Sequence, residues 1–193
     1  MGALPRRDLQ LQEVKALAHP LRQRILYHLA FAGPANSTTV ARAFGESTGT
    51  TSYHLRQLER YGFVEEIPER SAGRERWWRL VPLDLRGFAD GEEASSDEGR
   101  VAGAELERIR LERDRTLLAR YLGQRDRFAA WDDVAMFSSS ATRLTRDELK
   151  LFTEDYVDLF KKYWRPPDEC PADAEPIAAV FYAFPWPGGV TAP

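Results

Sequence analysis

The N-terminal half of the chain alternates between segments with apolar residues at helical spacing and short stretches of Gly, Pro and small polar residues. This pattern predicts a helix over 8–18 and a second over 20–31, with Pro20 in the first turn of the second helix. A third, shorter helix is predicted over 38–44 and ends at Gly45, a residue that favours helix termination. Each of these helices has one apolar face, so they are expected to pack around a common core.

A fourth helix, predicted over 47–60, has two unlike faces. Thr51, Leu55 and Leu58 recur at positions i, i+4 and i+7 and form its core-facing stripe. The opposite face carries small hydrogen-bonding side chains, which are poorer helix formers than the Glu, Lys and Gln usual on exposed helices. Two helices joined by a tight turn in this way predict a helix-turn-helix.

A β-hairpin is predicted immediately after these helices. Val64 and Ile67 alternate with acidic residues as a half-buried strand, and 77–81 supplies the return strand. This order is that of a winged helix-turn-helix, which we expect over residues 8–82. In such a domain helix 47–60 enters the major groove of a duplex and the hairpin tip contacts neighbouring phosphates.

The candidate DNA contacts are hydroxyl, imidazole and guanidinium groups, which can bind base edges or phosphate oxygens. They are Thr48, Thr50, Ser52, Tyr53, His54, Arg56, Arg70, Arg74 and Arg76. Two alternatives stay open. His54 either reaches a phosphate or packs beside Leu58, and the hairpin, with Glu69 and Glu75 among its arginines, can also be a solvated turn of mixed charge.

The C-terminal half has a different character. Residues 83–100 are acidic and rich in Gly and Ser, which predicts a flexible linker. Helical spacing then predicts a long helix over 101–131 and another over 146–163, and the apolar, aromatic run 177–184 predicts a strand. The expected fold class is therefore mainly α with small β: an N-terminal winged helix-turn-helix, a linker, a long helix and a small α+β region within 101–193.

The second half of the chain is also rich in aromatic residues. These side chains could line a pocket for an apolar or aromatic small-molecule effector, or they could form an ordinary small core with a dimer contact, which general packing favours. The candidate pocket residues are Tyr121, Phe128, Trp131, Phe137, Phe152, Tyr156, Phe181 and Tyr182. Residues 101–193 are thus expected to serve dimerisation and, in the first case, effector sensing.

Charge is divided unevenly along the chain, although the total is only −3. Residues 1–81 carry 12 Lys and Arg against 8 Asp and Glu, whereas residues 82–193 carry 15 against 22. Phosphate binding depends on local charge, so the N-terminal half is suited to DNA. With no apolar run near the ~20 residues of a membrane span and one cysteine, Cys170, a cytoplasmic protein without a membrane segment is expected.

Catalytic motifs are missing from the sequence. There is no Gly-rich phosphate loop, no nucleophile elbow and no HExxH metal motif. An enzyme is therefore not expected, and neither is a cofactor.

The runs HPLRQRILYHL and STTVARAFGESTGTTSYHLRQLERYGFVEE resemble the ArsR/SmtB-type winged-helix transcriptional regulators over about residues 10–82. The resemblance implies a homodimer that binds operator DNA and often releases it when an effector binds. It matches Thr48, Thr50, Ser52, Tyr53 and His54 to the recognition helix, Arg56 to a phosphate-facing position, and Arg70, Arg74 and Arg76 to the wing.

Metal-sensing members of that group carry paired cysteines on the helix that here reads TTVARAF. This chain has no cysteine before position 170 and only three histidines, so a non-metal-sensing type is expected and no metal site is predicted.

The sequence therefore predicts a sequence-specific, DNA-binding transcriptional regulator. We expect a homodimeric repressor that a small-molecule effector releases from double-stranded DNA. The alternatives are a winged-helix protein-interaction module, or a small-molecule-binding protein with secondary affinity for DNA.

Overall fold

The computed structural model describes residues 5–71, 73, 75–84, 92–165 and 169–188. Its α-helices are α1 (Leu11–Leu17), α2 (Pro20–Ala32), α3 (Ser37–Phe44), α4 (Thr48–Arg60), α5 (Glu92–Ser95), α6 (Asp97–Gly123) and α7 (Arg146–Tyr163). The strands are β1 (Ala35–Asn36), β2 (Val64–Glu66) and β3 (Trp77–Leu80), and the 3-10 helices are η1 (Pro68–Arg70) and η2 (Arg125–Trp131). The predicted class, mainly α with small β, is confirmed.

Local signals in the sequence set the ends of the helix-turn-helix. Pro20 occupies the first turn of α2, and the His19 ring accepts a hydrogen bond from the Leu21 backbone N–H at 3.1 Å. Gly45 has a φ of 70°, a left-handed conformation that favours glycine, and α3 ends there. The Ser47 hydroxyl then accepts from the Thr50 N–H at 3.0 Å and caps α4.

The sheet is small and lies entirely in the N-terminal half. Its order is β1-β3-β2 and both pairings are antiparallel, with Trp78 opposite Ala35 on one side and Glu66 on the other. β2 and β3 form the predicted hairpin. β1 was not predicted, because two residues are too few to show an alternating pattern.

The hydrophobic core joins the first four helices to the sheet. The stripe predicted on α4 is confirmed, since Thr51, Leu55 and Leu58 are all fully buried. The largest other side chains in this core are Leu9, Leu17, Ile25, Leu29, Val40, Phe63 and Trp78. Burial of one whole face of α4 leaves its opposite face free to meet a partner.

The flexible linker predicted over residues 83–100 is wrong for residues 92–100, which the structure describes as helical. α5 and the start of α6 occupy 92–100, and Ser96 caps α6 by accepting from the Gly99 N–H. Ala102 and Leu106 belong to the same core as the winged helix, and α6 packs against α1 and α2. Acidic residues favour a linker by composition, but here Asp97 and Glu98 lie in a first helical turn, where negative charge is favourable.

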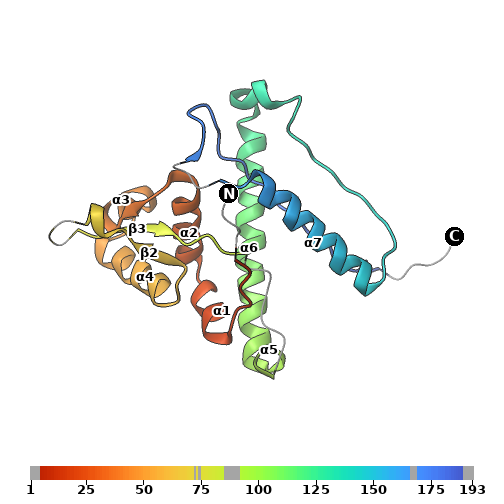
Figure 1. Cartoon of the computed structure of the whole chain (residues 1–193), viewed down its shortest axis with the longest axis horizontal. Coiled ribbons are helices and arrows are strands. Elements are labelled where there is room, and N and C mark those ends of the chain that lie inside the picture. Colours follow the sequence, from red (N-terminus) through yellow and green to blue (C-terminus); the bar gives the residue numbers. More distant parts are fainter. Residues whose placement is uncertain (1–4, 72, 74, 85–91, 166–168, 189–193) are drawn as a thin grey trace.

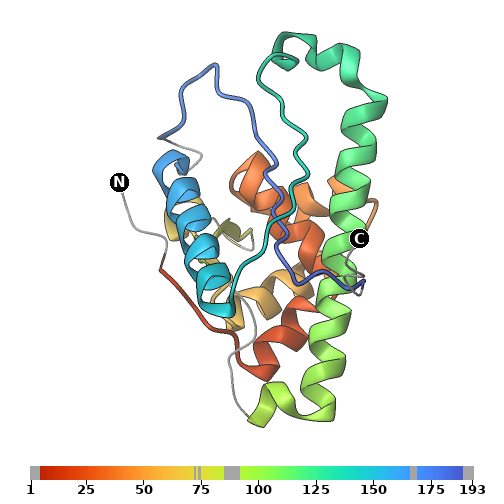
Figure 2. The ribbon, with the colours of Figure 1, turned by 90° about the vertical axis from the view of Figure 1, so that its right-hand side faces the viewer.

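The described residues beyond α6 do not form the predicted α+β region. α7 has no buried residue, and the described residues of 132–188 contain no strand, so the strand predicted over 177–184 is wrong. That segment is apolar, but the structure gives it no neighbouring strand to pair with. Figure 1 shows the winged helix on one side of α6 and α7 on the other, and Figure 2 shows extended segments on both ends of α7.

Candidate nucleic-acid interface

The exposed face of α4 is the centre of the candidate interface. Thr48, Tyr53 and Arg56 are exposed, with Tyr53 at 55%, and Thr50 and Ser52 are half-buried. Thr50, Ser52, Tyr53 and Arg56 lie outside the buried stripe, and Thr48 is exposed at the N-terminus of the helix. They present hydroxyl and guanidinium groups together, the chemistry needed for base edges and phosphates.

Buried hydrogen bonds hold this face in position. The hydroxyl of Thr51 donates to the Ser37 carbonyl oxygen at 2.9 Å and so ties α4 to the first residue of α3. On the exposed side, Arg56 Nη2 donates to the Ser52 hydroxyl at 3.0 Å, and Arg56 Nε donates to the Ser52 carbonyl at 3.3 Å. The guanidinium and the hydroxyl predicted to contact DNA are therefore coupled to each other before any duplex is bound.

His54 does not belong to this exposed face, so its assignment as a DNA contact is wrong. Its side chain is only 7% exposed and its ring centroid lies 4.4 Å from that of His19. Burial, with smaller contributions from His19 and Arg22, lowers the pKa of His54 to about 4. The ring is thus neutral near pH 7 and packs inside the domain.

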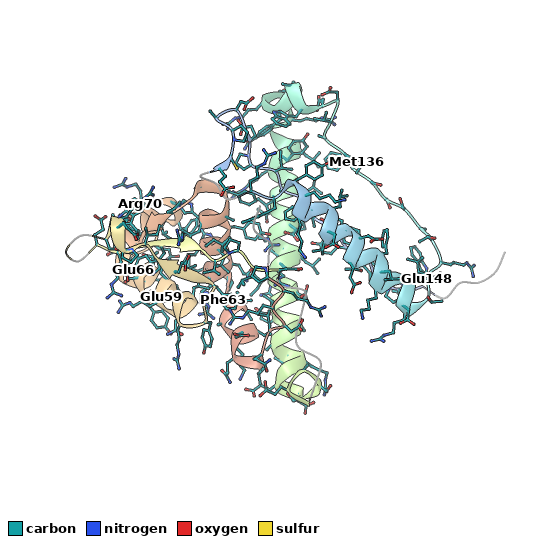
Figure 3. The ribbon with its side chains drawn as sticks, viewed as in Figure 1. Glu59, Phe63, Glu66, Arg70, Met136 and Glu148 are labelled. Atoms are coloured by element: carbon teal, nitrogen blue, oxygen red, sulfur yellow. The ribbon has the colours of Figure 1, made fainter. Side chains whose placement is uncertain are left out.

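The wing presents arginines whose charges are partly balanced by acidic neighbours. Arg70, in η1, lies 5.9 Å from the Trp77 ring centroid, and Arg76 pairs with Glu66 at 3.5 Å. Arg74, the third predicted wing contact, lies outside the described residues. Figure 3 places Arg70 and Glu66 together at the wing, far from Met136 and Glu148 on the other side of α6.

The recognition helix and the wing meet at a hollow that the sequence did not reveal. It is lined by Ser37, Ser52, Arg56, Arg76 and Trp78. Three of these were predicted contacts, whereas Ser37 and Trp78 were missed. Only the pairing of β3 with β1 and the packing of α3 against α4 bring these two residues to the same place.

The eight aromatic candidates for an effector pocket lie in different groups. Tyr121 contacts Phe128 and Phe137, with ring centroids 5.7 and 5.9 Å apart. In the second group, Phe181 stacks on Tyr156 at 4.0 Å and contacts Phe152 at 5.8 Å.

None of the eight side chains is buried, and in this single chain they form neither an enclosed pocket nor a core. The structure places Tyr182 elsewhere, with its hydroxyl donating to the Asp114 carboxylate of α6. Trp131, at the end of η2, is half-buried.

The part of the chain that the structure describes contains neither a cluster of metal ligands nor a candidate membrane-spanning helix. There, no three His, Cys, Asp or Glu side chains converge in a way that could hold a metal ion. Within the same ranges, no helix is both long enough and apolar enough to cross a membrane.

Comparison with known proteins gives one family match. Residues 17–67 match the model of a helix-turn-helix domain. No curated protein matches the chain.

Solved structures similar to this chain include three described as regulators or sensors. One is a possible transcriptional regulatory protein from Mycobacterium bovis (25% identity, 52% of this chain and 85% of that one, TM-score 0.32). Another is an ArsR-like transcriptional regulator from Rhodococcus sp. RHA1 (26% identity, 55% and 84%, TM-score 0.30). The third is the heme sensor PefR from Streptococcus agalactiae (14% identity, 78% and 78%, TM-score 0.32). At such TM-scores these likenesses add nothing to the family match.

The matched range 17–67 contains α2, β1, α3, α4 and β2, and the wing is completed by β3, which follows it. The chain therefore carries a winged helix-turn-helix domain, a DNA-binding domain of the kind found in transcriptional regulators.

Proposed function

We propose that this chain is a sequence-specific transcriptional regulator of the ArsR type that binds operator DNA as a homodimer and represses by occluding a promoter. The observation that carries the proposal is the exposed face of α4. It holds Thr48, Thr50, Ser52, Tyr53 and Arg56 on a helix whose opposite face is locked into the core. Such a face can enter a major groove without any rearrangement of the domain.

The homodimer is supported by the second half of α6. This helix has 27 residues and is therefore about 40 Å long, but the residues it buries all lie in its first half. Further along, Leu111, Leu118 and Leu122 are 52, 45 and 51% exposed. Their spacing of seven and four residues places them along one face of the helix, so a second copy of α6 could cover them.

A two-fold dimer would also match the geometry of DNA. Its two α4 helices would reach successive major grooves, whose centres lie about 34 Å apart, on a near-palindromic site. Repression and release by an effector follow from the resemblance to ArsR-type regulators. The aromatic groups around Phe137 and Phe181, none of which is buried in the single chain, are the candidate surface for an apolar effector that binds between the two copies.

The experiment that tests this function starts from a pool of random duplexes. The protein is used to select bound sequences over several rounds, and the mass of the complex is then measured by light scattering. We expect enrichment of an inverted repeat and a complex of two chains per duplex. Retention of duplexes without any shared sequence would contradict sequence-specific binding, and one chain per duplex would contradict the dimer.

A further inference from the structure

The hollow between the recognition helix and the wing is lined with hydrogen-bond donors from three parts of the fold. Ser37 is the first residue of α3, Ser52 and Arg56 come from α4, and Arg76 and Trp78 come from the start of the wing's return strand. Together they offer two hydroxyls, two guanidinium groups and an indole N–H. A concave site composed in this way suits an acceptor rather than a donor.

Trp78 gives the strongest indication that something is bound there. The residue is 2% exposed and lies in the central strand of the sheet, yet its Nε1 is buried without a hydrogen-bond partner. Buried donors in folded proteins are almost always paired. Because Trp78 also lines the hollow, its unpaired N–H points to an acceptor supplied by a ligand, which it reaches once the side chains that cover it move aside.

The charges around the hollow define the chemistry of that acceptor. Arg56 and Arg76 contribute two positive charges, and Glu66, which pairs with Arg76 at 3.5 Å, offsets one of them. A second carboxylate, that of Glu75, accepts from the side-chain amide of Asn36 beside Ser37 and lowers the positive charge further. The N-terminus of α3 adds the positive end of a helix dipole beside Ser37. This balance suits a singly charged phosphodiester better than a doubly charged free phosphate.

We infer that this hollow seats one phosphodiester of the DNA backbone, with the Trp78 indole N–H donating to a non-bridging oxygen beneath the Arg56 and Arg76 guanidinium groups. The inference rests on the proposed function and adds to it two contacts, Trp78 and Ser37. The seat fixes the distance between the recognition helix and the wing on the duplex, because it draws its donors from both. It would thus set the register in which α4 reads the groove.

The test replaces single phosphates of the selected duplex by neutral methylphosphonates, one position at a time, and measures affinity by fluorescence anisotropy. For the wild-type protein we expect one position in each half-site where the substitution weakens binding about tenfold, as for loss of a charge-assisted hydrogen bond. Trp78→Phe should weaken binding to the unmodified duplex by a similar factor and show little further loss at that position. Because the indole is uncharged, its loss should leave the salt dependence of binding unchanged.

Trp77→Phe is the matched control. It removes the same N–H from the neighbouring residue of β3, whose side chain points to the other face of the sheet under Arg70. This variant should keep the full methylphosphonate effect. If Trp78→Phe does not fold, which thermal unfolding will show, Ser37→Ala is measured instead and should lose part of the sensitivity at the same phosphate.

The possible outcomes separate the two claims. If Trp78→Phe and Ser37→Ala both bind as tightly as wild type and keep its full methylphosphonate loss, the phosphate seat is overturned and the DNA-binding function stands. If the wild-type protein binds no duplex, the proposed function fails and the seat fails with it. The hollow could instead bind free phosphate. A titration with inorganic phosphate, monitored by tryptophan fluorescence, tests this alternative. Saturable binding of free phosphate, with no sensitive position in the duplex, would also overturn the seat.

Discussion

The imidazole rings of His19 and His54 lie 4.4 Å apart and join the beginning of α2 to the middle of the recognition helix. His19 caps α2 through its Nδ1, while the Nδ1 of His54 is buried without a hydrogen-bond partner. Burial lowers the pKa of both rings below the ordinary value of 6.5, to about 4 for His54. The contact behind the DNA-binding face is therefore built from two neutral rings.

Acid should weaken the fold through this pair. The unfolded chain takes up a proton on His54 near pH 6.5, whereas the folded chain resists protonation down to about pH 4. The free energy of unfolding should therefore fall as the pH drops from 6.5 towards 4, with His54 contributing up to about 3 kcal/mol. Urea unfolding at several pH values measures this, and His54→Leu should flatten part of the slope. An identical pH slope in the variant would contradict the assignment.

Ser52 and Arg56 should affect DNA binding in different but coupled ways. Arg56→Ala should weaken binding to all duplexes and reduce the salt slope by about one, as expected for a phosphate contact. Ser52→Ala should mainly reduce discrimination between the operator and random DNA. Because the two side chains are hydrogen-bonded at 3.0 Å, the double variant should lose less than the two single losses added together. Equal losses on operator and random DNA in both single variants would contradict base readout by Ser52.

A charge on the exposed stripe of α6 should prevent dimerisation. Leu118→Glu would place a carboxylate where the second copy is proposed to pack. Burying this charge without a partner costs more free energy than the apolar contacts of the interface can offset. Light scattering should show a monomer for this variant and a dimer for the wild type. Val101→Glu, which changes an apolar residue that is 71% exposed at the other end of α6, is the control and should remain dimeric. A dimeric Leu118→Glu would show that the copies meet elsewhere.

Tyr182 should hold the segment after α7 against α6. Its hydroxyl donates to Asp114, and burial, together with this hydrogen bond, raises the pKa of Tyr182 to about 12. The neighbouring Arg113 joins α6 to α2. Its guanidinium carbon lies 3.9 Å from the centroid of the Tyr27 ring, and its Nη1 donates to Gln23 Oε1 at 3.3 Å.

Tyr182→Phe should therefore increase proteolytic cleavage and hydrogen exchange within 171–186 without lowering the melting temperature of the winged helix. Tyr163→Phe, an exposed tyrosine on α7, serves as the control. Unchanged exchange in Tyr182→Phe would show that the hydrogen bond does not anchor the segment.

The winged helix was predictable because its signals are local. Thr51, Leu55 and Leu58 define a buried stripe by spacing alone, and Pro20 and Gly45 mark a helix start and a helix end. The same spacing contains His54 at i+3 from Thr51, so its burial was also readable from the sequence. The two alternatives for His54 stayed open because a histidine on a recognition helix can also reach a phosphate.

The remaining features depend on tertiary contacts that a local pattern does not contain. β1 exists only through its pairing with Trp78, and the hollow requires Ser37 to approach a strand about forty positions later in the chain. The apolar run 177–184 resembles a strand, but whether such a run becomes one depends on a neighbour that can pair with it. The described aromatic residues of the C-terminal half are exposed or half-buried in the single chain, which fits burial against a second copy rather than within one core.

The central claim is that the exposed face of α4 binds a specific duplex. The most direct measurement is fluorescence anisotropy with a duplex from the region upstream of this protein's own coding sequence, compared with a random duplex over a series of salt concentrations. We expect tighter binding to the upstream duplex and a steep fall in affinity for both as salt rises, because several phosphates are contacted. Equal affinity for the two duplexes, or binding that salt does not weaken, would contradict the claim and favour a winged helix that binds a protein partner.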